Sequence, residues 1–151
     1  YIGDGNNMAH SLLVGCAIMG IDCSVAAPKN YEIKQDILTL AKEKANRTGA
    51  VIKQTNDPIE AVKDADIVYT DVWTSMGFEK ETSERLQAFA DFQVNGELVK
   101  HAKEDYLFFH CLPAHRGEEV SAEIIDGPHS VVFDEAENRL HAQKAIRASL
   151  L

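Results

Sequence analysis

The sequence predicts an α/β fold: a single domain built on a doubly wound, Rossmann-like parallel sheet, three layers deep, with helices on both faces. Short apolar segments alternate with longer segments whose apolar residues recur at helical spacing, which is typical of a parallel sheet. Polar clusters follow several apolar segments, at the strand ends where such folds bind ligands. The 151 residues, 45% of them hydrophobic, are enough for one buried core.

About six strands are expected, each a short apolar run bounded by turn residues. The chain opens inside the first strand, because only Tyr1 and Ile2 precede a glycine turn and a strand normally runs about five residues. We therefore expect a domain cut from a longer protein. The other strands are predicted at residues 21–28, 50–55, 66–73, 106–113 and 130–133.

Helices are predicted between these strands from apolar spacing and from end signals. The helix over 8–20 should end at Gly20, and the helix over 32–49 should end at Gly49. Asp57 should cap a helix over 56–65, with Pro58 at its first position. Later helices are predicted at residues 95–102, 121–126 and 134–151, and a loop leads into a further helix within 74–89.

Charge and composition exclude several classes of partner. The net charge is −9, and such a surface repels phosphate backbones, so we expect no nucleic acid partner. No apolar run reaches the roughly 20 residues that span a bilayer, so we expect no membrane insertion. The three cysteines are odd in number and widely spaced, which favours a reducing, cytoplasmic compartment.

The first polar cluster, "GDGNNMAH", only partly fits a dinucleotide-binding turn. That fingerprint needs a third glycine or alanine where Met8 stands. The next predicted strand ends "AAPKN", without the acidic residue that would bind a ribose. What remains is a tight turn in which Asn6 or Asn7 caps the following helix.

The second cluster, "TDVWTSMGFEKE", places Asp71 at a strand end, before a loop that contains Ser75 and Gly77. A carboxylate, a hydroxyl and accessible backbone suit a zwitterionic ligand that carries an ammonium group. A helix-capping loop, in which Asp71 and Ser75 satisfy nearby backbone donors, explains the same residues equally well. The single tryptophan, Trp73, either packs in the core or lines the site.

The third cluster, "HCLPAHR", has three interpretations. Zinc would need at least three ligands, but His110 and Cys111 are neighbours in a strand and should point to opposite faces. A nucleophilic Cys111 would need a cation such as His115 or Arg116 to lower its pKa. A buried structural cysteine is the commonest outcome for a free thiol.

The fourth cluster, "AENRLHAQKA", lies in the first turns of the last predicted helix. Arg139 and Gln143 are four residues apart and share a face. A guanidinium near strand ends can hold an oxyanion or a carbonyl oxygen. A solvated Arg139 paired with Glu135, also four residues away, is the simpler alternative.

Together, the segments "GDGNNMAHSL", "DVWTSMG", "HCLPAHRGEEV" and "FDEAENRLHAQKA" closely resemble the second half of the ornithine carbamoyltransferase family, in that family's order and spacing. The resemblance covers essentially the whole chain, and the "SMG" loop and "HCLP" are its most specific marks. Cys111 stands where the related aspartate carbamoyltransferases carry proline, which favours ornithine within the wider family.

The resemblance implies that residues 1–151 form the ornithine-binding domain of an enzyme that converts ornithine and carbamoyl phosphate into citrulline and phosphate. It implies no metal and no organic cofactor. The implied ornithine contacts are Asn7, Asp71, Ser75 and Met76, and the implied carbamoyl phosphate contacts are Cys111, Leu112 and Arg139. The catalytic residues that it implies are Asp71, Cys111 and Arg139.

One departure from the family is large, because its Ser-Thr-Arg-Thr phosphate-binding segment is absent from these residues. We therefore expect that the N-terminal carbamoyl phosphate-binding domain is missing and that the fragment alone is inactive. The resemblance also implies that the full protein is a homotrimer or a multiple of trimers. The alternatives are a carbamoyltransferase for another amine such as putrescine, an NAD-dependent dehydrogenase domain, and a non-catalytic binding relative.

Overall fold

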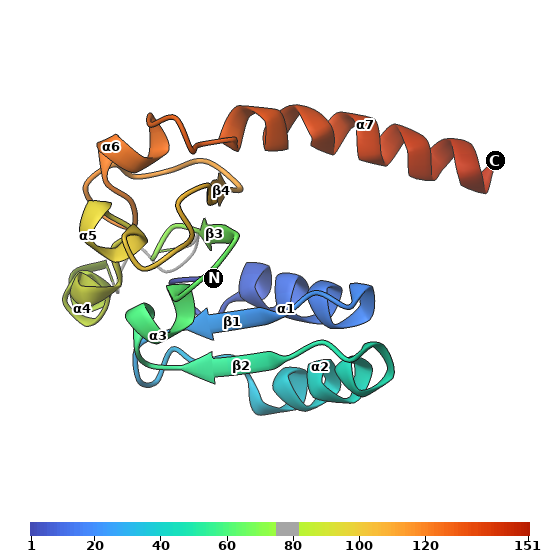
Figure 1. Cartoon of the computed structure of the whole chain (residues 1–151), viewed down its shortest axis with the longest axis horizontal. Coiled ribbons are helices and arrows are strands. Elements are labelled where there is room, and N and C mark those ends of the chain that lie inside the picture. Colours follow the sequence, from blue (N-terminus) through green and yellow to red (C-terminus); the bar gives the residue numbers. More distant parts are fainter. Residues whose placement is uncertain (75–81) are drawn as a thin grey trace.

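The computed structural model describes residues 1–74 and 82–151, and these residues form a parallel α/β sheet with helices on both faces (Figure 1). β1 pairs with β2, with Cys23 opposite Ile52, and β3 pairs with β4, with Ile67 opposite Leu107. The strands are β1 (Cys23–Ala26), β2 (Ile52–Thr55), β3 (Ile67–Thr70) and β4 (Leu107–His110).

Single bridging residues join these two pairs and extend the sheet. Ile2 bridges both Ala26 of β1 and Thr70 of β3, and Ser130 bridges Phe108 of β4, all in parallel. The order across the sheet is therefore β2, β1, Ile2, β3, β4 and Ser130. This is the doubly wound order, and the direction of winding reverses beside Ile2. The predicted fold class is confirmed.

The helices follow the predicted segments closely, and local signals explain their ends. Asn6 caps α1 by accepting hydrogen bonds from the backbone amides of Met8 and Ala9, and Asp57 caps α3. Gly20 and Gly49 end α1 and α2 in the left-handed conformation, as predicted. The helices are α1 (Asn7–Met19), α2 (Gln35–Thr48), α3 (Pro58–Val62), α4 (Thr82–Ala88), the 3₁₀ helix η2 (Ala90–Phe92), α5 (Gly96–Val99), α6 (Ala122–Ile125) and α7 (Val132–Leu150).

The core lies in two layers, one on each face of the sheet. Successive strand residues point to opposite faces, and the neighbours Val25 and Ala26 belong to different clusters. Val25 packs with Leu13 of α1 and other residues of α1 and α2, whereas Ala26 packs with Val62 of α3 and the aromatic residue Phe108. These two clusters give the three layers predicted from the sequence.

The prediction of a strand over 130–133 is wrong in extent. Only Ser130 bridges to β4, and α7 already begins at Val132. The apolar run "VVF" resembles a strand. However, Val132 is buried and Phe133 is 76% exposed, because α7 begins here at the protein surface. α7 then projects away from the rest of the molecule (Figure 1). No helix in the described part of the chain is both long and apolar enough to cross a membrane.

Candidate active site

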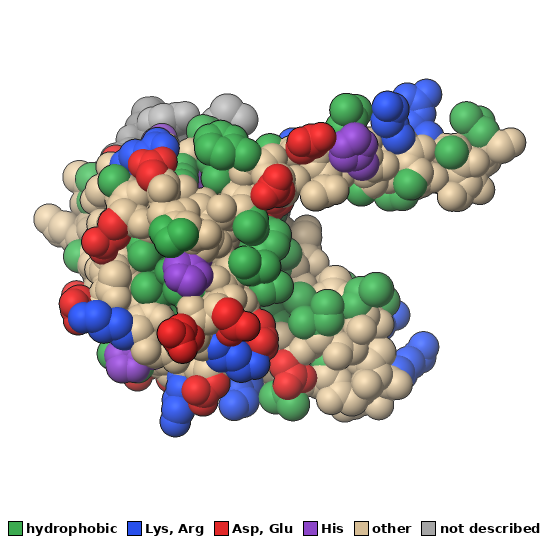
Figure 2. Space-filling view, turned by 45° about the horizontal axis from the view of Figure 1, so that its top comes forward, with side chains coloured by type: hydrophobic (Ala, Val, Ile, Leu, Met, Phe, Trp, Pro, Cys, Tyr) green, Lys and Arg blue, Asp and Glu red, His purple; other side chains and the backbone are tan. Residues whose placement is uncertain are grey.

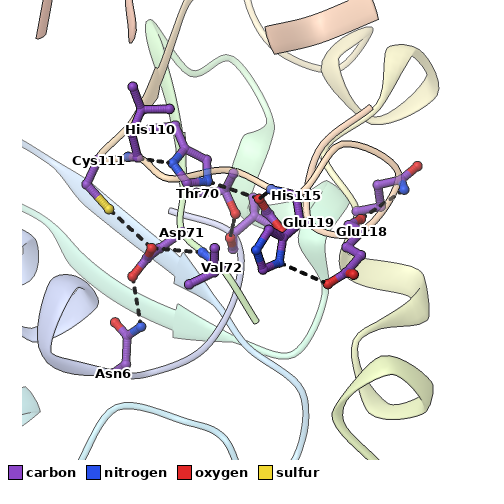
Figure 3. Close-up of polar contacts among 12 residues, drawn as sticks. Asn6, Thr70, Asp71, Val72, His110, Cys111, His115, Glu118 and Glu119 are labelled. Atoms are coloured by element: carbon purple, nitrogen blue, oxygen red, sulfur yellow. Dashed lines mark hydrogen bonds and ion pairs between the residues drawn. The ribbon is translucent and has the colours of Figure 1, made fainter. Parts of the chain in front are cut away.

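Asp71 lies at the carboxyl end of β3, beside the point where the winding of the sheet reverses, and the residue is 8% exposed. Three donors hold its carboxylate (Figure 3). The Cys111 thiol donates to Oδ1 at 3.1 Å, the Val72 backbone amide donates to the same oxygen at 2.8 Å, and the Asn6 side-chain amide donates to Oδ2 at 3.1 Å. The carboxylate is therefore fixed in orientation at the edge where doubly wound folds bind ligands.

Asn6 connects this carboxylate to the start of α1. Its Oδ1 accepts from the backbone amides of Met8 and Ala9 at 2.9 and 3.2 Å, so its Nδ2 is left to donate to Asp71. The glycine turn before it is held equally closely. A Cβ on Gly5 would lie 2.4 Å from the backbone carbonyl carbon of Glu32, so only glycine fits there.

His110 and Glu119 form a buried pair beneath the loop that carries Cys111 (Figure 3). His110 Nδ1 accepts from the Leu112 backbone amide at 2.9 Å, so its Nε2 carries the proton and donates to Glu119 at 3.2 Å. The same oxygen of Glu119 accepts from the His115 backbone amide at 2.6 Å. This chain of hydrogen bonds holds Leu112, which has a φ of 53° and is followed by a cis peptide bond to Pro113.

Cys111 itself is partly buried and remains a thiol. Burial, followed by its hydrogen bond to Asp71, raises the pKa of Cys111 to about 12. Because a thiolate is the nucleophilic form of cysteine, this environment opposes nucleophilic catalysis. Of the interpretations left open by the sequence, the one in which a neighbouring cation lowers this pKa is excluded, because the two interactions that raise it most after burial come from the Asp71 carboxylate.

Arg85 anchors the glycine turn through Asp4. Its Nη1 donates to Asp4 at 2.7 Å and to the Trp73 backbone carbonyl at 2.9 Å, and its guanidinium lies 5.0 Å from the centre of the Tyr31 ring. Burial raises the pKa of Asp4, and Arg85 opposes that rise. Trp73 is buried and stacks on Phe89, so it is a core residue.

The other residues singled out from the sequence lie at different depths. Asn7 is exposed in the first turn of α1, and Leu112 is partly buried. Arg139 is exposed on α7, and among the described residues the hydrogen bonds of Asp71 and Cys111 go to other partners. Ser75 and Met76 lie outside the residues that the structure describes.

The possible metal site has donors that are already engaged. Donor atoms of Asp71, His110 and Cys111 lie within 4.8 Å of one another, because β4 ends at His110 and the two neighbours no longer face opposite sides. Both nitrogens of His110 are nevertheless taken by hydrogen bonds to Leu112 and Glu119. A metal bound to His110 would have to displace one of these two hydrogen bonds, so the residues present fit a hydrogen-bonded frame better than a zinc site.

Sequence reasoning missed two residues of this frame. Glu119 is fully buried, although glutamate is rarely buried without a partner. A signal was available, since Glu119 precedes the apolar Val120 and follows two histidines that could pair with it. The partners of Glu135 were also missed: it accepts from the Tyr69 hydroxyl and the His110 backbone amide.

The fold and this edge define a doubly wound ligand-binding domain, with a carboxylate and a protonated thiol at the switch point of the sheet. Residues 1–150 match the family model for the aspartate/ornithine carbamoyltransferase Asp/Orn-binding domain. The chain belongs to the aspartate/ornithine carbamoyltransferase family.

Individual relatives agree with this assignment. An ornithine carbamoyltransferase of Bacillus subtilis is 62% identical over the whole chain, which covers 47% of that protein, and one of Pyrococcus abyssi is 57% identical and covered to 48%. The solved ornithine carbamoyltransferase of Pyrococcus furiosus superposes with a TM-score of 0.93 at 56% identity, over 98% of this chain and 47% of that one. The chain thus spans about half the length of the relatives that it matches.

Proposed function

We propose that residues 1–151 form the ornithine-binding domain of an ornithine carbamoyltransferase, whose carbamoyl phosphate-binding domain lies outside these residues. The complete protein would convert ornithine and carbamoyl phosphate into citrulline and phosphate. The observation that carries the proposal is the Asp71 carboxylate, held by Cys111 and Asn6 at the switch point of the sheet. The ornithine carbamoyltransferases cited above, at 56–62% identity, support the same substrate.

The first chemical task is to make an amine nucleophilic. The pKa of an alkyl ammonium is about 10.4, so the side chain of ornithine arrives protonated. Asp71 is an acceptor for that ammonium, and the Cys111 thiol, 3.1 Å from Asp71, lies at the same place. Together they can bind the ammonium and share its proton as the attack begins. Asn7, Ser75 and Met76 would bind the rest of ornithine.

The second task is the transfer itself. The amine nitrogen forms a bond to the carbamoyl carbon, the bond from that carbon to the phosphate oxygen breaks, and phosphate leaves with the electron pair. The nitrogen gives up its second proton to the leaving phosphate, which carries the electron pair of the broken bond. We propose that Arg139 stabilises the charge that develops on the carbamoyl oxygen, and that Cys111 and the Leu112 carbonyl contact the carbamoyl group.

The alternatives are less well supported. A dehydrogenase would use the glycine turn to admit a pyrophosphate, but Gly5 is already required by the close approach of the Glu32 backbone. An N-acetyl-L-ornithine transcarbamylase superposes with a TM-score of 0.82, but at only 30% identity. Putrescine keeps both amines but lacks the carboxyl group of ornithine, which the "SMG" loop would help to bind.

The complete protein would act as a homotrimer or a multiple of trimers, in the cytoplasm, without a cofactor. Its substrates would be ornithine and carbamoyl phosphate, and its necessary partner would be the N-terminal domain. The net charge and composition of the sequence disfavour nucleic acid and membrane partners.

The test is citrulline formation by the complete protein and by residues 1–151 alone, with ornithine and with putrescine. We expect the complete protein to turn over ornithine and the fragment to turn over neither substrate. Putrescine turnover by the complete protein should be lower by about 10³-fold or more, because the polar groups that bind ornithine would stay unpaired. The variant Asp71→Asn should lose most of the activity. Equal use of putrescine, or no citrulline from the complete protein, would refute the proposal.

A further inference from the structure

Glu135 stands out on α7 because its side chain faces the sheet. Its Oε1 accepts from the Tyr69 hydroxyl at 2.6 Å, and its Oε2 accepts from the His110 backbone amide at 3.1 Å. Both oxygens of one carboxylate are therefore used by two different strands. The neighbouring acidic residue, Asp134, is exposed, so the favourable effect of negative charge on a helix start does not by itself explain where Glu135 points.

These two contacts join the three segments that carry the proposed catalytic residues. Tyr69 is two residues before Asp71 on β3, and His110 directly precedes Cys111 at the end of β4. Arg139 lies one helical turn after Glu135 on α7. The Glu135 carboxylate is thus hydrogen-bonded to β3 and to β4, and it belongs to the same helix as Arg139.

Among the residues that the structure describes, few others set the direction of α7. Val132 is buried and the Val131 amide donates to the Phe108 carbonyl at 3.0 Å, which ties the chain just before the helix. From residue 136 to residue 151 every residue is exposed, and α7 extends from the body as an arm (Figure 2). Among the described residues, Glu135 is the last residue of α7 that is not exposed, and it is hydrogen-bonded to the sheet.

The surroundings of Tyr69 suit a lasting hydrogen bond. Its ring stacks between Tyr1 and Phe109, with ring centres 6.1 and 6.2 Å away, which fixes the direction of its hydroxyl. Burial, followed by the hydrogen bond to Glu135, raises the pKa of Tyr69 above its ordinary value. The hydroxyl therefore stays protonated and remains a donor at neutral pH.

We propose that Glu135 is a positioning residue of the carbamoyl transfer: by bonding Tyr69 and His110 it fixes the start of α7 and so places Arg139 at the carbamoyl group. The inference rests on the proposed function. In this role Glu135 acts only through its hydrogen bonds to Tyr69 and His110; it transfers no proton and does not contact the substrate. A misplacement of about 1 Å in a catalytic group can cost on the order of 10²-fold in rate, so a positioning role is measurable.

The experiment compares variants of the complete protein. We expect Glu135→Ala to lower kcat/KM for carbamoyl phosphate by about 10- to 100-fold, and Tyr69→Phe, which removes only one hydroxyl, by a smaller factor. Glu135→Gln should keep most of the activity, because its carbonyl can accept from the His110 amide while its NH₂ donates to the Tyr69 oxygen. Glu137→Ala, which removes the same charge from an exposed position on the same helix, is the matched control and should be close to wild type.

A double-mutant cycle separates positioning of Arg139 from general stability. In the Arg139→Ala background, Glu135→Ala should have at most about a threefold further effect, because the group that it positions is gone. Full additivity of the two changes, or a loss in Glu135→Gln as large as in Glu135→Ala, would overturn the inference. Wild-type protein that makes no citrulline would instead refute the proposed function, so the two failures are distinguishable.

Discussion

The reactivity of Cys111 gives the most direct test of the site. Burial and the Asp71 carboxylate raise its pKa from 9.0 to about 12. At pH 8 an ordinary thiol with a pKa of 9.0 is about one-tenth thiolate, whereas a thiol with a pKa of about 12 is about one part in ten thousand thiolate. Since the thiolate is the reactive form, Cys111 should be alkylated about 10³-fold more slowly than a cysteine in a short peptide.

The pH dependence of the alkylation rate shows whether the pKa of Cys111 is raised or lowered. A raised pKa keeps the thiol protonated over the whole range from pH 7 to pH 9.5. The alkylation rate of Cys111 should therefore rise about tenfold per pH unit throughout that range, whereas the rate of the peptide levels off above pH 9. In Asp71→Asn the carboxylate charge is lost but burial remains, so we expect the pKa to fall only partly and the rate to rise about tenfold.

The assay is iodoacetamide labelling of the folded chain, quenched at intervals and analysed by mass spectrometry of the peptide that contains Cys111. The variant Cys111→Ser confirms the assignment of that peptide. Labelling of Cys111 within tenfold of the peptide rate, or a rate that levels off below pH 9, would refute the reasoning. Such a result would mean that the thiolate is accessible and that a nucleophilic role must be considered again.

Two further predictions concern stability. Glu119→Ala should destabilise the chain by about 2–6 kcal/mol in urea unfolding, because it leaves the His110 Nε2–H and the His115 backbone amide without their buried acceptor, at about 1–3 kcal/mol for each donor. Glu119→Gln keeps an acceptor oxygen and should cost clearly less; equal losses would contradict the hydrogen-bonded frame. Gly5→Ala should prevent folding or strongly destabilise the fold, because the added Cβ would lie 2.4 Å from the Glu32 backbone. Gly15→Ala, in the middle of α1, should stabilise the chain by up to about 1 kcal/mol, because its Cβ meets nothing within 4 Å. Thermal unfolding of both variants checks the contrast.

Much of the local structure could be predicted from the sequence, because short-range chemistry determines it. Gly20 and Gly49 end helices since glycine adopts the left-handed conformation without a steric penalty, and Asp57 with Pro58 begins one. The alternation of apolar runs and helical periods predicted the sheet and its two covered faces. Where two periods were equally plausible, as in "SVVF", the prediction failed, because only the surroundings show which of the apolar residues is buried.

The residues of the candidate site were predictable mainly through their place at strand ends and through the family resemblance. Parallel strands bring Asp71 and Cys111 to one edge of the sheet, so their proximity follows from the fold class. What remained open was the state of the thiol. A cluster with two histidines and an arginine was compatible with a lowered pKa as well as with a buried structural thiol, whereas in the structure burial and the carboxylates of Asp71 and Glu135 raise the pKa of Cys111.

By itself, then, the sequence determined the fold class, most helix ends and the family, since each depends on near neighbours along the chain or on motifs read in order. Only the tertiary structure decided which polar groups meet. Asn6 reaches Asp71 across 65 positions of sequence, and Tyr69 reaches Glu135 across 66. Such partners are set by how the sheet and its helices pack, and a buried polar group must find a partner wherever packing places one. For that reason the frame around Cys111 and the anchor of α7 became visible only in three dimensions.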